Sequence, residues 1–323
     1  MDLPLVTVGV ASFNNASYLR ETLESIRLQT YAHIEVIIVD DASRDDSVMV
    51  AKAWLAEHPD VDGRLICHEA NLGVCRVCNG IVTQGRGEFI SIIGSDDVFL
   101  SDKLSRQVAL MLQAPPEVGV VFGDNGHMDS TGKSIPTPTD VAPMHTGNVF
   151  LALLKANFVP ATSTLVRRSC YEKVGLYDEN LNYEDWDIWL RIAREFEFLY
   201  VPRVEAIYRV HNKSATYTRR LQIEESSLVL LCKHLDYSVE GDKIIHRHVR
   251  QLSESIYQLG STNAHGWLKK AHSHSSDKRT FALLLLSTLR IEAEKVRRIK
   301  SLIRSARNLL DFFLAYIYKI NKL

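Results

Sequence analysis

Two adjacent carboxylates, Asp96 and Asp97, directly follow an apolar run in the segment GEFISIIGSDDVFL (87–100). Such a run is typical of a buried β-strand, so both side chains are expected at the carboxyl edge of a sheet. Neighbouring carboxylates repel each other there unless a cation or hydrogen-bond donors join them. Mg²⁺ or Mn²⁺ carrying a diphosphate would do so, because these metals bind through one or two carboxylates and phosphate oxygens. The alternative is a pair of residues that caps the following helix.

Acidic residues also follow a second strand-like run, in IVDDAS (38–43). A carboxylate at this place could accept hydrogen bonds from a nucleobase or a ribose. The alternative is again a helix cap, here for a helix over 45–57.

A third acidic segment, NYEDWDIWLRIA (182–193), has Glu184 and Asp185 where an amphipathic helix opens. A carboxylate beside a bound electrophile can act as a general base. Acidic residues at a helix N-terminus are also favourable without any catalytic role. In YRVHNKS (208–214), His211 could ligate a metal or could be an ordinary surface or core histidine.

The elements around these residues alternate between strand and helix patterns. β-Branched runs are typical of parallel strands, and helix-spaced apolar residues separate them. The expected strands are 5–12, 34–39, 64–69 and 88–93, and the expected helices are 18–27, 45–57 and 73–84. This order predicts a doubly wound parallel sheet with helices on both faces, which binds ligands at the carboxyl ends of its strands.

The rest of the chain changes character near residue 216. Before it we expect a helix over 102–113, a strand over 119–123, a loop over 129–147, a helix over 148–156, an extended piece over 162–167 and a helix over 186–196. After it the pattern is almost purely helical, so the sequence predicts two regions, 1–215 and 216–323. Apolar residues recur at helical spacing from Ile299 to Ile320 and form one stripe.

Charge and cysteine content narrow the class of protein. The chain has 38 Lys and Arg against 39 Asp and Glu, which argues against a uniformly basic nucleic-acid binder. Residues 1–214 carry a net charge of −10 and residues 215–323 one of +9, so a basic helical region follows an acidic one. Five cysteines and the lack of a basic stretch before the first apolar run favour a cytoplasmic protein. Cys75 and Cys78 are expected to be two buried thiols.

In this order and spacing, the segments resemble the family 2 glycosyltransferases of the GT-A fold. The resemblance covers residues 5–214 and rests on VTVGVASFNNASYLRETLESIRLQTYAHIEVIIVDDASRDDS, NLGVCRVCNG, GEFISIIGSDD, STLVRRSCYEKVGLYDENLNYEDWDIWLRIA and YRVHNKS. It implies a Rossmann-like, mostly parallel α/β sheet flanked by helices, with a C-terminal helical extension.

The resemblance also implies roles for individual residues. Those expected to bind a nucleotide sugar are Ser12, Phe13, Asn14, Asp41, Asn71, Gly73 and Asp96, with Phe13 beside the base and Asp41 hydrogen-bonded to it. Asp96, Asp97 and His211 are the expected metal site. Asp185 matches the catalytic base, with Glu184 and Trp186 on the acceptor side. Asp40 is expected to orient the loop that follows it.

Three features depart from the family pattern. Gly94 stands where the metal motif often begins with Asp, Ala-Ser-Phe replaces a common Pro-Thr-Tyr after the first strand, and Cys78 replaces an expected arginine near the diphosphate. The metal site must therefore rest on Asp96 and Asp97.

The expected activity is inverting transfer of a hexosyl or N-acetylhexosaminyl group from a nucleoside-diphosphate sugar, most often a UDP-sugar in this family, with Mn²⁺ or Mg²⁺. The expected acceptor is a hydroxyl of a glycan or of a polyprenyl-diphosphate-linked glycan in surface polysaccharide synthesis. The basic C-terminal helices would then meet an anionic membrane at its inner face or form a homo-oligomer. Two alternatives stay open: a nucleotidyltransferase that makes sugar nucleotides, and a non-catalytic scaffold of polysaccharide synthesis.

Overall fold

The computed structural model describes residues 3–137, 142–211, 220–274 and 278–289, together with Ile291 and Glu294. The chain divides into two compact units, Met1–Arg219 and Arg220–Leu323. The predicted stripe from Ile299 to Ile320 lies outside the described residues.

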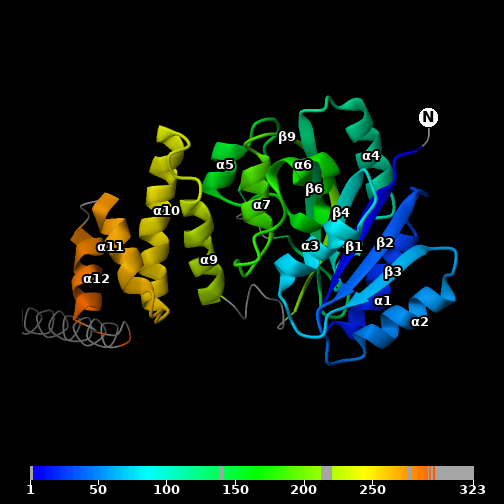
Figure 1. The fold of residues 1–323 in the computed structure, drawn as a ribbon, viewed down its shortest axis with the longest axis horizontal. Helices are drawn as coiled ribbons and strands as arrows, with labels where there is room; N and C mark the ends of the chain where they lie inside the picture. The colour runs from blue at the N-terminus through cyan, green and yellow to red at the C-terminus, as the bar shows by residue number, and fades with distance from the viewer. Residues whose placement is uncertain are drawn as a thin grey trace, which may run out of the picture. The chain divides into compact units, whose positions relative to one another are not determined.

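The first unit is built on a sheet whose first four strands are parallel, in the order β3-β2-β1-β4 (Figure 1). The four strands are β1 (Val6–Ser12), β2 (Ile34–Asp40), β3 (Asp62–Cys67) and β4 (Phe89–Gly94). The apolar residues of β1, β2 and β4 are largely buried, as parallel strands between helices require, whereas β3 at the edge of the sheet is half-buried. The expected strand and helix order of this half is confirmed.

Helices cover both faces of these strands. The side chains of α1 (Ala16–Arg27), α2 (Ser47–Glu57) and α4 (Lys103–Gln113) join one large apolar core on one face. On the other face, α3 (Val74–Gln84) packs Val77 and Ile81 against β2. A glycine at position 9 permits this close packing, since a Cβ there would lie 2.2 Å from Cγ2 of Ile81.

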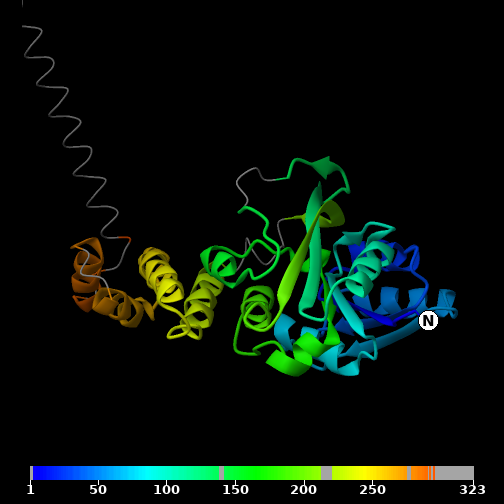
Figure 2. The same cartoon turned by 90° about the horizontal axis from the view of Figure 1, so that it is seen from above.

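The second half of the sheet is mixed in direction, with short antiparallel pairings beside the long parallel pair of β6 and β9. Beyond β4 the order is β8-β6-β9-β5, with β8 antiparallel to both of its neighbours and β6 parallel to β9. The strands are β5 (Val98–Phe99), β6 (Val118–Asp129), β7 (Ser134–Ile135), β8 (Leu165–Arg167) and β9 (Glu197–Val210). Figure 2 shows the long β6 and β9 side by side.

Two strands are longer than the sequence pattern predicts. The expected strand at 119–123 continues to Asp129, and most of β9 had no strand prediction. Polar and glycine residues over 124–129 have low intrinsic β-propensity, but pairing with β9 along their whole length supplies the ladder that local sequence does not reveal. The expected loop over 129–147 contains β7, which pairs with β6.

Short helices complete the first unit. They are α5 (Phe150–Lys155), a 3₁₀ turn at Ala161–Ser163, α6 (Arg168–Val174) and α7 (Asp185–Ile192). The helix α7 ends before residue 196, where the expected helix ended, because β9 begins at Glu197.

The second unit is helical throughout its described part. It contains α9 (Arg220–Cys232), α10 (Val239–Gln258), α11 (Ala264–His274) and α12 (Lys278–Thr288). The hydroxyl of Ser238 caps α10 by accepting a hydrogen bond from Gly241 N–H at 3.0 Å. Within the described residues, no helix combines the length and apolarity that a membrane span requires.

Candidate active site

The register of the parallel strands brings four predicted or chemically capable side chains to one edge of the sheet. Ser12 pairs with Asp40, and Asp40 pairs with Cys67. Beyond this row, the N–H groups of Asp41, His68 and Ser95 continue the ladder at 2.9, 2.9 and 3.0 Å. Consequently the residues that follow these strands lie at one edge: His68, Asp41 and Phe13 directly after β3, β2 and β1, and Asp96 two residues after β4. We call these four residues the carboxyl edge.

The turn after β1 is held by hydrogen bonds to the loop after β2. The Ser12 hydroxyl donates to Oδ2 of Asp40 at 3.1 Å, and Oδ1 of Asp40 accepts from Ser43 N–H at 2.8 Å. Asn14 adopts a left-handed backbone with φ of 54°, and its Oδ1 accepts from Arg44 N–H at 2.8 Å. Phe13 is left 38% exposed, a high value for a large apolar side chain in an ordered turn.

Asp41 is engaged by the loop that precedes α3. Its Oδ1 accepts from Leu72 N–H at 2.8 Å and from His68 Nδ1 at 2.7 Å, and its Oδ2 accepts from Gly73 N–H at 2.9 Å. Asn71 donates from Nδ2 to the Asp41 carbonyl at 3.3 Å. Gly73 has a φ of 89°, which an L side chain rarely adopts. The structure therefore brings Asn71 and Gly73 to Asp41.

The two carboxylates after β4 take opposite directions. Oδ2 of Asp96 lies 2.8 Å from Nε2 of His211, and Asp96 remains partly exposed. Asp97 is buried and accepts from Arg209 N–H at 2.9 Å and from the Thr162 hydroxyl at 3.4 Å. Burial raises the pKa of Asp97 well above its ordinary value, and the charge of Asp96 adds to the rise. Asp97 was expected to help hold the metal, but its carboxylate faces protein donors. Asp96 instead lies next to His211.

Arg209 links this motif to α1 from beneath. Its buried guanidinium donates to Oε2 of Glu21 at 2.6 Å and to the Asp96 carbonyl at 2.8 Å, and it lies 4.5 Å from the centre of the Tyr18 ring. The Tyr18 ring in turn stacks on His211 with centroids 5.5 Å apart. One buried cation therefore positions the backbone of Asp96 and, through Tyr18, the ring of His211.

Asp185 begins α7 and is held on both carboxylate oxygens. Oδ2 accepts from Nδ2 of Asn157 at 2.8 Å, and Oδ1 accepts from Trp186 N–H at 2.7 Å. Burial raises the pKa of Asp185 above its ordinary value, and these two hydrogen bonds oppose part of the rise. Burial also raises the pKa of Glu184 to about 7, with the charge of Asp185 adding to it. The indole N–H of Trp186 donates to the Leu153 carbonyl at 2.8 Å, which fixes α7 to α5.

The loop that leads into Asp185 is anchored on α3. Nδ2 of Asn79 donates to the Tyr177 carbonyl at 3.0 Å, and Oδ1 of Asn79 accepts from Tyr177 N–H at 2.8 Å.

The two cysteines of α3, Cys75 and Cys78, are buried, and burial raises the pKa of both thiols, that of Cys75 to about 12. The prediction of two buried thiols is confirmed, since their environment disfavours the reactive thiolate.

Among the described residues, a metal at Asp96 would have two protein side-chain ligands, Asp96 itself and His211. Across the part of the chain that the structure describes, no group of three or more His, Cys, Asp or Glu side chains is arranged to hold a metal ion. The pair of Asp96 and His211 offers one carboxylate and one imidazole. This donor set fits a divalent ion that takes its remaining ligands from a diphosphate and water.

The sequence reasoning missed three residues that support this site. Asn157 carried no motif, and Thr162 lay in a piece that was predicted only as extended. His68 lay inside the predicted strand 64–69, although its place directly after the apolar residues of β3 matches that of Asp41 after β2. That shared placement is the one signal that could have revealed it.

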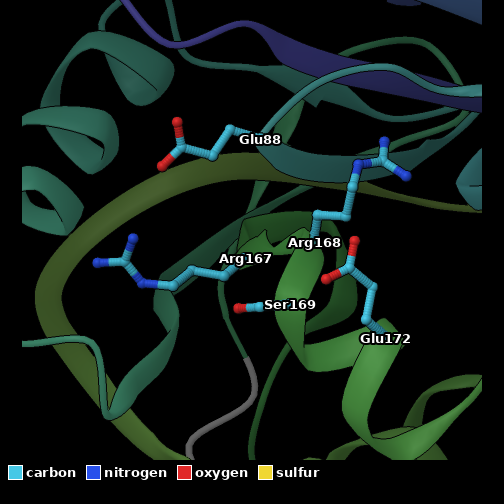
Figure 3. Close-up of a pocket in the computed structure, with 5 residues that line it drawn as sticks. All are labelled: Glu88, Arg167, Arg168, Ser169 and Glu172. Atoms are coloured by element: carbon cyan, nitrogen blue, oxygen red, sulfur yellow. The ribbon is translucent and has the colours of Figure 1, made fainter.

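A cavity of about 270 Å³ lies elsewhere, lined by Glu88, Arg167, Arg168, Ser169 and Glu172 (Figure 3). Glu88 precedes β4, so this cavity is at the amino end of the strand, opposite Asp96. The two arginines extend in different directions, and each donates to backbone carbonyls, Arg167 to Val118 and Arg168 to Gly87. No predicted site residue lines it.

Comparison with known proteins identifies the family. The model of the family described as glycosyl transferase family 2 matches residues 7–175, just over half of the chain. The chain belongs to this family, and it is a glycosyltransferase. A putative glycosyltransferase of Bacillus subtilis, EpsH, is 30% identical over 258 residues, which is 76% of this chain and 72% of EpsH. An uncharacterized glycosyltransferase of Rickettsia typhi is 26% identical over 227 residues, 69% of each chain.

Solved structures share the fold. A mannosyltransferase from Pyrobaculum calidifontis, in complex with GDP-Man and Mn²⁺, superposes with a TM-score of 0.61 at 19% identity and covers 96% of this chain and 88% of its own. A fragment of S. aureus TarS in complex with UDP-GlcNAc gives a TM-score of 0.64 at 15% identity, covering 94% and 92%. The expected fold class, a GT-A sheet flanked by helices with C-terminal helices, is confirmed.

Proposed function

We propose that this glycosyltransferase transfers a sugar from a UDP-sugar, with inversion at the anomeric carbon, to a hydroxyl of a glycan or of a lipid-linked glycan. One observation carries the proposal. The carboxyl edge has an exposed aromatic ring at Phe13, after β1, and a carboxylate at Asp96, after the neighbouring β4, a combination that suits the base and the diphosphate of a nucleotide. Structural relatives that bind GDP-Man, UDP and UDP-GlcNAc support a nucleotide-sugar donor.

Asp96 and His211 would hold a divalent ion, Mn²⁺ or Mg²⁺. Bound there, the ion would neutralise the negative charge that develops on the diphosphate as it leaves. The role of the chain is to keep both ligands in place: Arg209 fixes the backbone of Asp96, and Tyr18 packs against His211. The relative that was solved with Mn²⁺ supports this assignment.

Asp185 would accept the proton of the acceptor hydroxyl. Its two hydrogen bonds fix the orientation of the carboxylate, and the raised pKa makes it a stronger base than an exposed carboxylate. Trp186 lies beside it on α7, where an indole face could pack against an acceptor sugar. Glu184 would share this acceptor side.

A panel of UDP- and GDP-sugars with Mn²⁺ tests the proposal, with release of the nucleoside diphosphate as the readout. We expect release from a UDP-sugar and a loss of that release on chelation of the metal. Formation of a sugar nucleotide from a nucleoside triphosphate and a sugar 1-phosphate would instead favour a nucleotidyltransferase. Binding without any turnover across the panel and added acceptors would favour a scaffold.

We also propose that the C-terminal region brings the enzyme to an anionic membrane surface. The described part of this region exposes Phe281, Leu285 and Leu289 at helical spacing on and just after α12, and residues 215–323 are basic overall. Co-sedimentation with vesicles that contain anionic lipid should exceed that with neutral vesicles. Truncation after residue 294 should reduce it, and equal binding of both proteins would contradict the proposal. A homo-oligomer through the same helices would appear as concentration-dependent mass in solution.

A further inference from the structure

We propose that His68 reads the nucleobase of the donor by accepting a hydrogen bond from a ring N–H at its Nε2, while Asp41 positions the His68 ring. This inference rests on the proposed function, because it presumes that a nucleotide occupies the carboxyl edge. It reassigns the contact with the base from Asp41, for which it was expected, to its neighbour.

The position of His68 follows from the backbone register. His68 is the first residue after β3, its N–H continues the ladder to the Asp40 carbonyl at 2.9 Å, and Asp41 follows β2 in the same way. Phe13 follows β1 one strand further along. The aromatic ring of Phe13 and the polar side chains of Asp41 and His68 therefore directly follow three adjacent strands. An aromatic ring can stack on the face of a base, and a polar side chain can hydrogen-bond to its edge.

Asp41 has little capacity left for a ligand. Three donors already occupy its carboxylate, namely Leu72 N–H, Gly73 N–H and Nδ1 of His68. The side chain is only 4% exposed. Asp41 therefore fixes the loop before α3 and orients the imidazole of His68.

The contact with Asp41 decides what His68 can offer. An ionised carboxylate only accepts hydrogen bonds, so Nδ1 of His68 must carry the proton. In the neutral ring Nε2 is then an acceptor. The His68 side chain is 16% exposed, and among the described residues no group is hydrogen-bonded to its Nε2.

An acceptor at this position selects bases by one atom. Uracil carries a hydrogen at N3 and guanine carries one at N1, whereas the matching ring nitrogens of cytosine and adenine carry lone pairs. His68 would therefore favour uridine or guanosine diphosphates, with the base stacked on Phe13.

Calorimetric titration of the full chain with UDP and with N3-methyl-UDP tests the assignment. Wild type should bind UDP about 3- to 10-fold more tightly than the methylated nucleotide, the worth of one neutral hydrogen bond. His68→Asn places an amide N–H where Nδ1 was and has no atom at Nε2, so it should lose this preference. His68→Gln places an amide oxygen near Nε2 and should keep part of it. His58→Asn, the same change in a histidine at the end of α2, should leave it intact. Should wild type favour GDP, the pair becomes GDP and N1-methyl-GDP.

The outcomes separate the inference from the function beneath it. Absence of nucleotide binding by wild type would overturn both. Tight binding with an unchanged preference in His68→Asn, or with no preference in wild type, would overturn the role of His68 alone. A measurement on wild type covers the case in which His68→Asn fails to fold. In ¹⁵N-histidine-labelled protein, Nε2 of His68 should shift on addition of UDP and not of N3-methyl-UDP, and an unmoved signal would contradict the proposal.

Discussion

The two halves of the site are built in different ways. The carboxyl edge follows from the register of parallel strands, because paired strands end together just before Phe13, Asp41 and Asp96. Asp185 instead begins a helix after a loop, and its position depends on side-chain hydrogen bonds from Asn157 and on the anchoring of the loop by Asn79. The first half should therefore respond to changes in packing and charge at the sheet, and the second to the loss of single hydrogen bonds.

The largest effect on metal binding is expected at Asp96, which faces His211, whereas the adjacent Asp97 is buried. Asp96→Asn should weaken Mn²⁺ binding in the presence of UDP by about 10- to 100-fold, because it removes one of two protein ligands. Asp97→Asn should leave it within about twofold, since the amide oxygen can accept the bond from Arg209 N–H and the amide N–H can donate to the Thr162 hydroxyl. Titration followed by the electron paramagnetic resonance of free Mn²⁺ measures both. Equal losses of Mn²⁺ affinity in the two variants would contradict the assignment of Asp96, and not Asp97, as the metal ligand.

A second prediction concerns the packing that supports the edge. Gly9→Ala places a Cβ against Ile81 on α3 and should lower the free energy of unfolding by about 1–3 kcal/mol. Gly80→Ala is the matched control, because its Cβ would have no neighbour closer than 4.0 Å. In the interior of α3, that change should raise the free energy of unfolding by up to about 1 kcal/mol. Chemical denaturation measures both, and equal effects would contradict the packing argument.

The smallest expected effect lies in the second half. Asn157→Ala removes a hydrogen bond that lowers the pKa of Asp185, so this pKa should rise further above its ordinary value. The base must be deprotonated to act, so the acidic limb of kcat/KM should move to higher pH. Asn180→Ala, in the loop before α7 and bonded to Asp178, should leave the limb in place. An unshifted limb in Asn157→Ala would exclude the positioning role of Asn157.

The contrast also explains how much of the molecule its sequence predicts. Strand runs that end in Asp40, Asp41, Asp96 and Asp97 predict the carboxyl edge, because parallel register leaves little freedom there. The pattern fails for β9, whose length depends on pairing with β6, and for Asn157, which meets Asp185 only through the tertiary fold. It also fails for the difference between Asp96 and Asp97, since one residue of this turn pairs with His211 and the next is buried against Arg209 N–H.

The central claim is that the carboxyl edge binds the donor while Asp185 performs the proton transfer. One experiment on Asp185→Asn tests it most directly, by measuring UDP affinity with Mn²⁺ and sugar transfer on the same preparation. The account predicts UDP affinity within about twofold of wild type and transfer reduced by about 10²- to 10⁴-fold, the usual contribution of a general base. Transfer at the wild-type rate, or a loss of UDP affinity as large as the loss of transfer, would contradict it.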